Sequence, residues 1–305
     1  MEKVRKLGQY QNGNYLVIVF DDGTKIRYNK KDSLVPSTIE SMDIKITNYC
    51  DNGCLMCHEN SSIDGKHGDI LGPSFLDNLH PYTELAIGGG NPLSHPDLDS
   101  FLVKCKERKF IPSMTISQNH FMKNYNRIMN LIDDKLIYGL GVSFSYIDDE
   151  FISAFKLIPN GVLHVINGII LPFQLEYLSN KDLKILILGY KDFGRGHMML
   201  EKQEESIEFI QKQTKDILPT IIRDKWFKVV SFDNLAIKQL DVKYILSKKE
   251  WDEFYMGDDG QYTMYVDMVN RIFSKSSTSP IEERYPLMDT VEEMLNKLKE
   301  NQKNG

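Results

Sequence analysis

From residue 42 onward, short apolar runs typical of β-strands alternate with segments of helical pattern. The strand candidates are Met42–Thr47, Glu84–Ile87, Ser113–Ser117, Leu140–Ser145, Val162–Asn167, Lys184–Gly189 and Lys228–Phe232. Helical patterns lie between them, for example over Asp97–Lys109, Phe121–Ile132 and Glu201–Ile217. Because parallel strands are joined by helical crossovers and are covered on both faces, this alternation predicts βαβ units around a uniformly apolar parallel sheet. Six or seven units predict an α/β fold, a partial or nearly closed (β/α) barrel.

The N-terminal segment departs from this alternation. The β-rich runs Asn14–Phe20 and Lys25–Tyr28 flank the glycine-containing turn Asp21–Thr24, which is typical of a β-hairpin. We expect a small β extension over residues 1–40, and we interpret this hairpin as a cap over an exposed edge of the sheet.

The C-terminal segment changes character from about Leu240. Between Trp251 and Asp267, two aromatic-rich runs surround Gly257–Gly260, which predicts a second hairpin followed by helices. We therefore expect a partial (β/α)6-type barrel over 41–240 and a C-terminal α+β extension over 241–305. The extension would serve as a lid over the barrel mouth or as a docking element.

Composition limits the class of protein. The chain has 305 residues, of which 41% are hydrophobic and 26% charged, the balance of a globular protein in water. It contains no run of about 18 apolar residues, so we predict no membrane span. Residues Met1–Gly8 lack the apolar core of a signal peptide. The net charge of −6 gives no general attraction to phosphate backbones, which disfavours nucleic acid as a partner.

Three of the four cysteines lie within eight residues. Cys50, Cys54 and Cys57 have the spacing C-x3-C-x2-C, directly after the first predicted strand. This grouping is no disulfide framework, and it favours a reducing cytoplasm. Three thiolates can hold three irons of a [4Fe–4S] cluster, which normally takes four. The remaining cysteine, Cys105, falls in a helical pattern and is interpreted as a buried helix residue. The motif therefore predicts a cluster with one open iron, the kind of open position that catalytic metal sites keep.

A glycine-rich turn follows the second predicted strand. Gly88, Gly89 and Gly90 precede Asn91 and Pro92. Without a Cβ, the backbone can approach a ligand closely, and its N–H and C=O groups can bind a carboxylate and an ammonium. A tight turn is the structural alternative for this segment. Because active sites of α/β barrels form at the carboxyl ends of the strands, we expect the turn to lie beside the cysteine loop.

Together these motifs resemble the radical S-adenosylmethionine (radical SAM) superfamily. Cys50, Cys54 and Cys57 match its cluster motif, and Gly89–Pro92 resembles its Gly-Gly-Glu-Pro motif, which holds the methionine amino group. The resemblance covers roughly residues 42 to 190. Two positions depart from it: Met56 replaces the usual aromatic residue before the third cysteine, and Asn91 replaces the acidic residue. Ammonium binding would then depend more on backbone carbonyls.

The resemblance implies one [4Fe–4S] cluster and S-adenosylmethionine as cofactors. Reductive cleavage of the sulfonium would give a 5′-deoxyadenosyl radical that abstracts hydrogen from a substrate, while the protein supplies placement. An electron donor such as flavodoxin or ferredoxin is implied. The substrate stays open between a peptide, a small metabolite or nucleotide, and a partner enzyme, with a peptide or small molecule favoured by charge.

Further cofactor contacts are implied at strand ends. Residues expected near the ribose, the methionine carboxylate or adenine are Gln118, Asn119, Ser143, Ser145, Asn167, Gly189 and Tyr190, together with Met56 and the glycine turn. Helix caps and turn residues are the alternative interpretation of these positions.

Two titratable residues are candidates for catalysis. His58 directly follows the last motif cysteine, and Arg195 lies between two glycines, where it suits a carboxylate or phosphate. Solvated loops explain both equally well.

A different class of function is also open: Cys50, Cys54, Cys57 and His58 could form a zinc-binding Cys3His interaction module without catalysis. However, adjacent Cys57 and His58 do not easily point at one tetrahedral centre.

Overall fold

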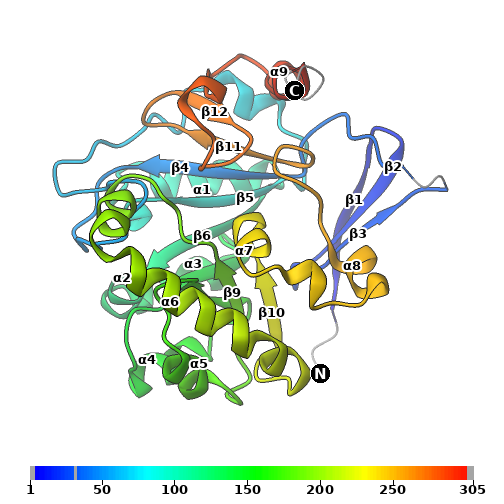
Figure 1. Ribbon diagram of the computed structural model, residues 1–305. Coiled ribbons are helices and arrows are strands. Elements are labelled where there is room, and N and C mark those ends of the chain that lie inside the picture. Colours follow the sequence, from blue (N-terminus) through cyan, green and yellow to red (C-terminus); the bar gives the residue numbers. More distant parts are fainter. Residues whose placement is uncertain (1–3, 31–32, 301–305) are drawn as a thin grey trace.

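The core of the fold is a ten-stranded, mostly parallel sheet (Figure 1). The computed structural model describes residues 4–30 and 33–300. In spatial order the strands are β10 (Val229–Phe232), β9 (Lys184–Leu188), β8 (Gly161–Ile166), β7 (Gly139–Ser143), β6 (Ile111–Ser117), β5 (Glu84–Gly89), β4 (Ser41–Thr47), β11 (Thr263–Asp267), β12 (Ile272–Ser274) and β13 (Tyr285–Pro286). Strands β4 to β11 pair in parallel, and β12 and β13 are antiparallel. The seven predicted strands are confirmed, and the fold is consistent with a partial barrel.

Helices connect the strands as predicted, with two differences. They are α1 (Leu98–Glu107), α2 (Gln118–Lys123), α3 (Tyr125–Asp133), α4 (Asp149–Phe155), α5 (Pro172–Leu178), α6 (Arg195–Arg223), α7 (Asn234–Gln239), α8 (Lys248–Phe254) and α9 (Val291–Glu300). The single helix expected over Phe121–Ile132 is two helices, because Asn124 has non-helical angles and its Nδ2 donates to the His120 carbonyl. The helix expected from Glu201 is preceded by a helical stretch from Arg195, and α6 is kinked at Gln203, whose backbone angles are not helical.

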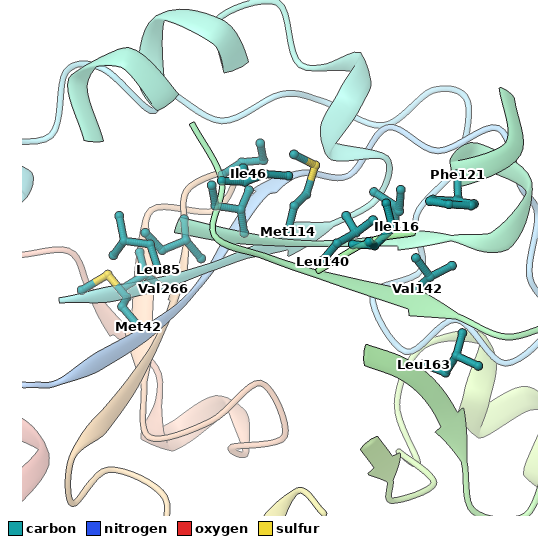
Figure 2. Packing of buried hydrophobic residues seen from close by; sticks show 14 of the residues in the cluster. Met42, Ile46, Leu85, Met114, Ile116, Phe121, Leu140, Val142, Leu163 and Val266 are labelled. Atoms are coloured by element: carbon teal, nitrogen blue, oxygen red, sulfur yellow. The ribbon is translucent and has the colours of Figure 1, made fainter. Parts of the chain in front are cut away.

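Alternate residues of the strands point to two different faces. In β4, Met42 and Ile44 are 0% and 1% exposed, whereas Asp43 between them is exposed. Figure 2 shows the apolar set, including Met42 and Leu163, on the side of the sheet toward the helices. We call this the helix-covered face and the opposite one the inner face. The prediction of uniformly apolar strands was therefore wrong, because the inner face carries polar groups such as Asp43 and His164.

The N-terminal segment forms a separate three-stranded sheet of β1 (Lys6–Asn12), β2 (Tyr15–Phe20) and β3 (Lys25–Tyr28). The predicted hairpin is confirmed as β2–β3, while β1 was missed. Its turn at Asp21 accepts a hydrogen bond from Asn160 Nδ2 (2.8 Å) and lines a cavity of about 290 Å³ with residues from the starts of β4 to β9. The hairpin thus lies under the amino ends of the strands instead of along an edge.

The C-terminal segment extends the sheet. The predicted hairpin around Gly257–Gly260 was wrong, because the preceding run forms the helix α8, whose N-cap Ser247 forms a capping box with Glu250. The antiparallel pair is β11–β12 instead. Strand β11 pairs with β4 on the side opposite β5, so this segment contributes to the walls of the site.

The expected outer segments reach residues 1–3 and 301–305, which lie outside the described residues. In the part of the chain that the structure describes, no helix has both the length and the apolar character needed to cross a membrane.

Candidate active site

The cysteine loop leaves the carboxyl end of β4 and folds back on itself. The Cys50 N–H donates to the Ser62 carbonyl (2.9 Å), and the Ser62 N–H donates to the Asn48 carbonyl (3.0 Å). Gly65 lies so near that a Cβ there would be 1.9 Å from the Asn48 oxygen, so this approach requires glycine. These bonds close the base of the loop and present the cysteines at the sheet end, as predicted.

The three motif cysteines are partly exposed and carry free thiols. Asn52 Nδ2 donates to the sulfur of Cys54 (2.9 Å), and burial raises the pKa of Cys50. Among the described residues, the sulfurs of Cys50, Cys54 and Cys57 do not all lie within 4.8 Å of one another. One tetrahedral zinc would bring its thiolates to about 3.8 Å, since Zn–S bonds are about 2.3 Å long. The donor set fits a polynuclear cluster, whose irons spread the thiolates, better than one zinc ion.

His58 contacts charged residues instead of joining the cysteines. Its Nε2 is 3.4 Å from Glu59 Oε1 and 3.4 Å from Lys191 Nζ. Burial and the nearby ammonium lower the pKa of His58, although the contact with Glu59 opposes them. The fourth ligand of the zinc alternative is therefore engaged elsewhere.

A buried set of charges fixes the end of the cysteine loop. Glu59 Oε2 is 2.6 Å from Lys45 Nζ, which is 3.0 Å from Asp267 Oδ2, and the Tyr265 hydroxyl donates to Glu59 Oε1 (3.0 Å). Burial disfavours the charge of Glu59, but the bonds from His58 and Lys45 hold its pKa below the ordinary value. Sequence reasoning missed this set. Its signal was the alternation of Asp43 and Lys45 with apolar residues in one strand.

Arg195 has a different role from the one expected. Its Nε donates to the Cys54 carbonyl (2.9 Å), its Nη1 donates to the Ser61 carbonyl (2.8 Å), and its backbone N–H donates to the Cys57 carbonyl (3.0 Å). The guanidinium is thus committed to backbone oxygens of the cysteine loop. We interpret Arg195 as a residue that positions this loop.

The loop before α6 also packs closely on the cysteine loop. A Cβ on Gly194, whose φ is +54°, would lie 2.7 Å from the His58 carbonyl oxygen. A Cβ on Gly196 would lie 3.4 Å from the backbone carbonyl oxygen of Met56. The Met56 backbone therefore faces α6.

The glycine turn contacts the cysteine loop through its backbone. The Gly90 N–H donates to the Thr47 carbonyl (2.7 Å), and the Asn91 N–H donates to the Tyr49 carbonyl (2.7 Å). A Cβ on Gly89 or Gly90 would come within 2.4 or 2.1 Å of these same two oxygens, whereas one on Gly88 would meet nothing within 4 Å. Gly89 and Gly90 thus permit loop-to-loop packing, and Gly88 borders open space. Pro92, which is buried, begins the following 3-10 turn.

Two predicted cofactor contacts have unused buried acceptors. The side-chain oxygens of Asn91 and Asn167 are buried without a hydrogen-bond partner among the described residues. Such atoms cost free energy unless a ligand donates to them. An ammonium or an aromatic amino group would supply such a donor to either oxygen.

Gln118 and Asn119 begin α2 and serve mainly to connect loops. Gln118 is 0% exposed, and its Oε1 accepts the Ser145 N–H (2.9 Å). Asn119 donates to Asn52 Oδ1 (2.8 Å) and accepts from the Tyr146 hydroxyl (3.0 Å). The structure thus brings Gln118, Asn119 and Ser145 together beside the cysteine loop.

Helix α2 also holds the cysteine loop through His120. His120 Nε2 lies 2.6 Å from Asp51 Oδ1, and one ligand atom each of Cys50, Asp51 and His120 lie within 4.8 Å of one another. Because His120 and Asp51 bind each other, we interpret this group as a tether of the cysteine loop.

Gly189 and Tyr190 follow β9 and are held by α7. Gln239 Oε1 accepts from the Tyr190 N–H (2.9 Å) and from Asn167 Nδ2 (3.1 Å). A Cβ on Gly189 would lie 2.4 Å from a Leu235 side-chain atom, so this glycine permits close packing of α7. Sequence reasoning missed Gln239, which orients both predicted adenine neighbours.

Ser143 and Cys105 lie on other elements. Ser143 is partly exposed at the end of β7. Cys105 is buried as predicted, and burial raises the pKa of its thiol to about 12.

Comparison with known proteins identifies similar folds. No protein-family model matches the chain, and no curated protein matches its sequence. The crystal structure of Streptococcus suis SuiB bound to precursor peptide SuiA matches with TM-score 0.52 and 14% identity, over 79% of this chain and 60% of that chain. SuiB bound to S-adenosylmethionine matches with TM-score 0.51 and 15% identity, over 80% and 61%.

A third match is the crystal structure of SuiB itself, with TM-score 0.50 and 12% identity over 91% of this chain and 82% of that one. The chain thus has the same overall fold as SuiB, at low sequence identity. It spans about three fifths of the first two SuiB chains.

Proposed function

We propose that this protein is a radical SAM enzyme. Cys50, Cys54 and Cys57 would hold one [4Fe–4S] cluster, and the glycine turn with Asn91 and Asn167 would bind S-adenosylmethionine. The observation that carries the proposal is the convergence of two motifs. The Gly90 and Asn91 N–H groups bond the first residues of the cysteine loop at 2.7 Å each, which sets the glycine turn beside the three thiols. A structure of the same fold, SuiB, binds S-adenosylmethionine, which supports this assignment.

When bound, the cluster and S-adenosylmethionine supply an electron and a sulfonium whose cleavage yields a 5′-deoxyadenosyl radical that abstracts hydrogen. The chain's own residues have three tasks. Arg195 and Glu59 hold the cysteine loop, and Asn52 donates to the sulfur of Cys54. The unpaired oxygen of Asn91 would accept a hydrogen bond from the methionine ammonium, at the position where the family's usual acidic residue offers a charged oxygen.

We propose a peptide as the first candidate substrate and a small molecule as the second. The support is that SuiB is found bound to a precursor peptide. An electron donor such as flavodoxin or ferredoxin would reduce the cluster, and free thiols favour a reducing cytoplasm. The N-terminal β sheet and the C-terminal extension are candidate docking surfaces for such partners.

Anaerobic reconstitution with iron and sulfide tests the proposal. We expect about four iron and four sulfide per chain, and cleavage of S-adenosylmethionine to 5′-deoxyadenosine after reduction. Cys54→Ala should abolish both, because the cluster loses one thiolate. Cys105→Ala is the matched control and should keep its iron, since that thiol is buried in α1. Tight binding of one zinc, with no cleavage, would support the interaction module instead.

A further inference from the structure

The inner face of the sheet carries polar groups that the proposed cofactor site does not use. Asp43 is exposed although β4 is paired on both sides, so its side chain faces open space on the inner face. His164 of β8 also lies on the inner face, and Lys191 follows Gly189 by two residues. Lys191 Nζ is 3.4 Å from His58 Nε2, which is 3.4 Å from Glu59 Oε1. Glu59 Oε2 is 2.6 Å from Nζ of Lys45, which follows Asp43 by two residues on the same side of β4. Three titratable groups from β4, β8 and the segment after β9 therefore share this face.

Lys191 keeps part of its hydrogen-bonding capacity free. Its Nζ donates to Ser277 Oγ (2.9 Å) and is 3.4 Å from His58 Nε2. Among the described residues, no carboxylate forms an ion pair with it. An ammonium has three donors, so at least one N–H remains for a ligand.

The side chains of Asp43 and His164 also have no hydrogen-bond partner among the described residues. Surrounding protein atoms reduce the hydration of both groups, although Asp43 stays open to solvent and His164 is partly exposed. This raises the pKa of Asp43 to about 6, with Lys191 opposing the shift, and lowers the pKa of His164 to about 4. The imidazole lies across β7, where a Cβ on Gly141 would be 2.3 Å from its Cε1. At neutral pH the face thus presents a carboxylate and an uncharged imidazole.

The other acidic groups near Asp43 are already engaged. Asp233 Oδ1 accepts the Gly189 N–H (2.9 Å) and the Ala236 N–H (2.7 Å), and Asp259 accepts Asn234 Nδ2 (2.7 Å). Both raise the pKa of Asp43 by repulsion. Among the described residues, the carboxylates of Asp233 and Asp259 thus accept hydrogen bonds, whereas the Asp43 side chain has no donor and Lys191 has no anionic partner.

We propose that Lys191, Asp43 and His164 form a substrate-binding site for an uncharged amide group. The chemical class is a carboxamide, either the side chain of Asn or Gln or a peptide-bond amide. The amide C=O would accept from Lys191, and its N–H would donate to Asp43, with His164 as a further partner. In its use as a substrate site, the inference rests on the proposed function.

The positive charge of Lys191 and the negative charge of Asp43 together favour an amide over a ligand with a single charge. A carboxylate satisfies Lys191 but is repelled by Asp43, and an ammonium has the reverse problem. An amide offers an acceptor and a donor at once, and its dipole lies favourably between the two charges. It also enters a partly buried region without carrying a net charge, whose desolvation is costly.

A titration with three probes of similar size tests the site. The full chain is labelled at histidine, the His164 signal is assigned by its loss in His164→Gln, and propionamide, propionate and propylammonium are added at constant pH. We expect a saturable shift of the His164 signal with propionamide alone. An equal or larger shift with propionate or propylammonium, or no saturable shift with any probe, overturns the inference.

Variants locate the binding. Asp43→Asn and Lys191→Met should each weaken propionamide binding about tenfold or more, because a hydrogen bond to a charged group is lost. Lys212→Met, at an exposed ion pair of α6, is the control and should bind as the unmodified chain does. If a variant does not fold, a crystal of the unmodified chain soaked with propionamide decides, since density away from Lys191 and Asp43 contradicts the site.

The titration is run on both metal-free and reconstituted protein, so the two proposals fail separately. Propionamide binding without cleavage of S-adenosylmethionine leaves the site standing and removes the proposed function. Cleavage without a saturable shift does the reverse.

Discussion

The two faces of β8 differ in what they contribute to the protein. On the helix-covered face, Leu163 and Val165 are 0% and 1% exposed and belong to the main core. On the inner face, Val162, His164 and Ile166 remain partly exposed. Consecutive residues of one strand thus pack into the core on one side and line a more open face on the other. The helices fill the first face with apolar side chains, while the second face carries polar groups that would be available to the proposed site.

The largest effect on stability should come from Lys45, whose ammonium is buried on the inner face with two carboxylates. Lys45→Met leaves Glu59 and Asp267 without their cation in a buried setting. Removing one partner of a buried pair costs about 3–5 kcal/mol, so the free energy of unfolding should fall by that amount in urea titration. Lys212→Met, at an exposed pair, should change it by less than about 1 kcal/mol. Equal losses would contradict the assigned role of Lys45.

Neighbouring residues of β8 test the contrast between the faces directly. Leu163→Ala removes a fully buried side chain and should reduce the free energy of unfolding by about 2–5 kcal/mol. Val162→Ala, one residue earlier on the inner face, should cost about 1 kcal/mol or less, because its side chain is already partly hydrated. Chemical denaturation measures both. If the two substitutions cost the same, the faces do not differ as described.

His164 should make stability depend on pH. Burial holds its folded-state pKa near 4, below the value of 6.5 for a free imidazole. The unfolded chain therefore takes up a proton first, and the stability that the neutral ring contributes is complete above pH 6.5 and lost as pH falls toward 4. The loss should be about 2 kcal/mol after allowance for partial exposure.

Thermal unfolding at several pH values checks this prediction. His164→Gln should remove that part of the pH dependence and leave the remainder. A variant that loses stability between pH 6.5 and 4 as steeply as the unmodified chain would show that His164 is not held neutral.

The smallest effect on stability is expected at Gly88. A Cβ there meets nothing within 4 Å, so Gly88→Ala should change the free energy of unfolding by less than about 0.5 kcal/mol. Gly90→Ala should cost about 1–3 kcal/mol, because its Cβ would lie 2.1 Å from the Tyr49 oxygen. Calorimetry of S-adenosylmethionine binding completes the test. Gly88→Ala should weaken that binding if the cofactor lies against the turn.

The sequence was sufficient for the local parts of the fold. The apolar runs of β4 to β10 are separated by helical patterns, so their existence and order could be predicted. The place of β11 in the sheet could not be predicted. Its aromatic run and the one before it have the sequence pattern of a hairpin, and only the pairing with β4 makes β11 part of the sheet. Nor could the break at Asn124 be predicted, since it depends on one side-chain bond.

For the candidate site, the sequence indicated which loops carry chemistry but not what supports them. The spacing of the cysteines and the glycines after the next strand predicted that the two motifs meet. Arg195 was expected to face a ligand, yet its guanidinium binds the cysteine loop, because α6 happens to start there. The contacts of Gln239 and the pairing of Glu59 with Lys45 were not predicted for the same reason. Their partners are distant in sequence and are brought together only by the packing of neighbouring loops.

The central claim is that three thiols at the carboxyl end of β4 hold a cluster with one iron open to S-adenosylmethionine. Electron paramagnetic resonance of the reduced, reconstituted protein tests this most directly. We predict the signal of a reduced [4Fe–4S] cluster whose shape changes when S-adenosylmethionine is added, because the cofactor binds the open iron. A signal that stays the same on addition, or protein that retains no iron, would contradict the account.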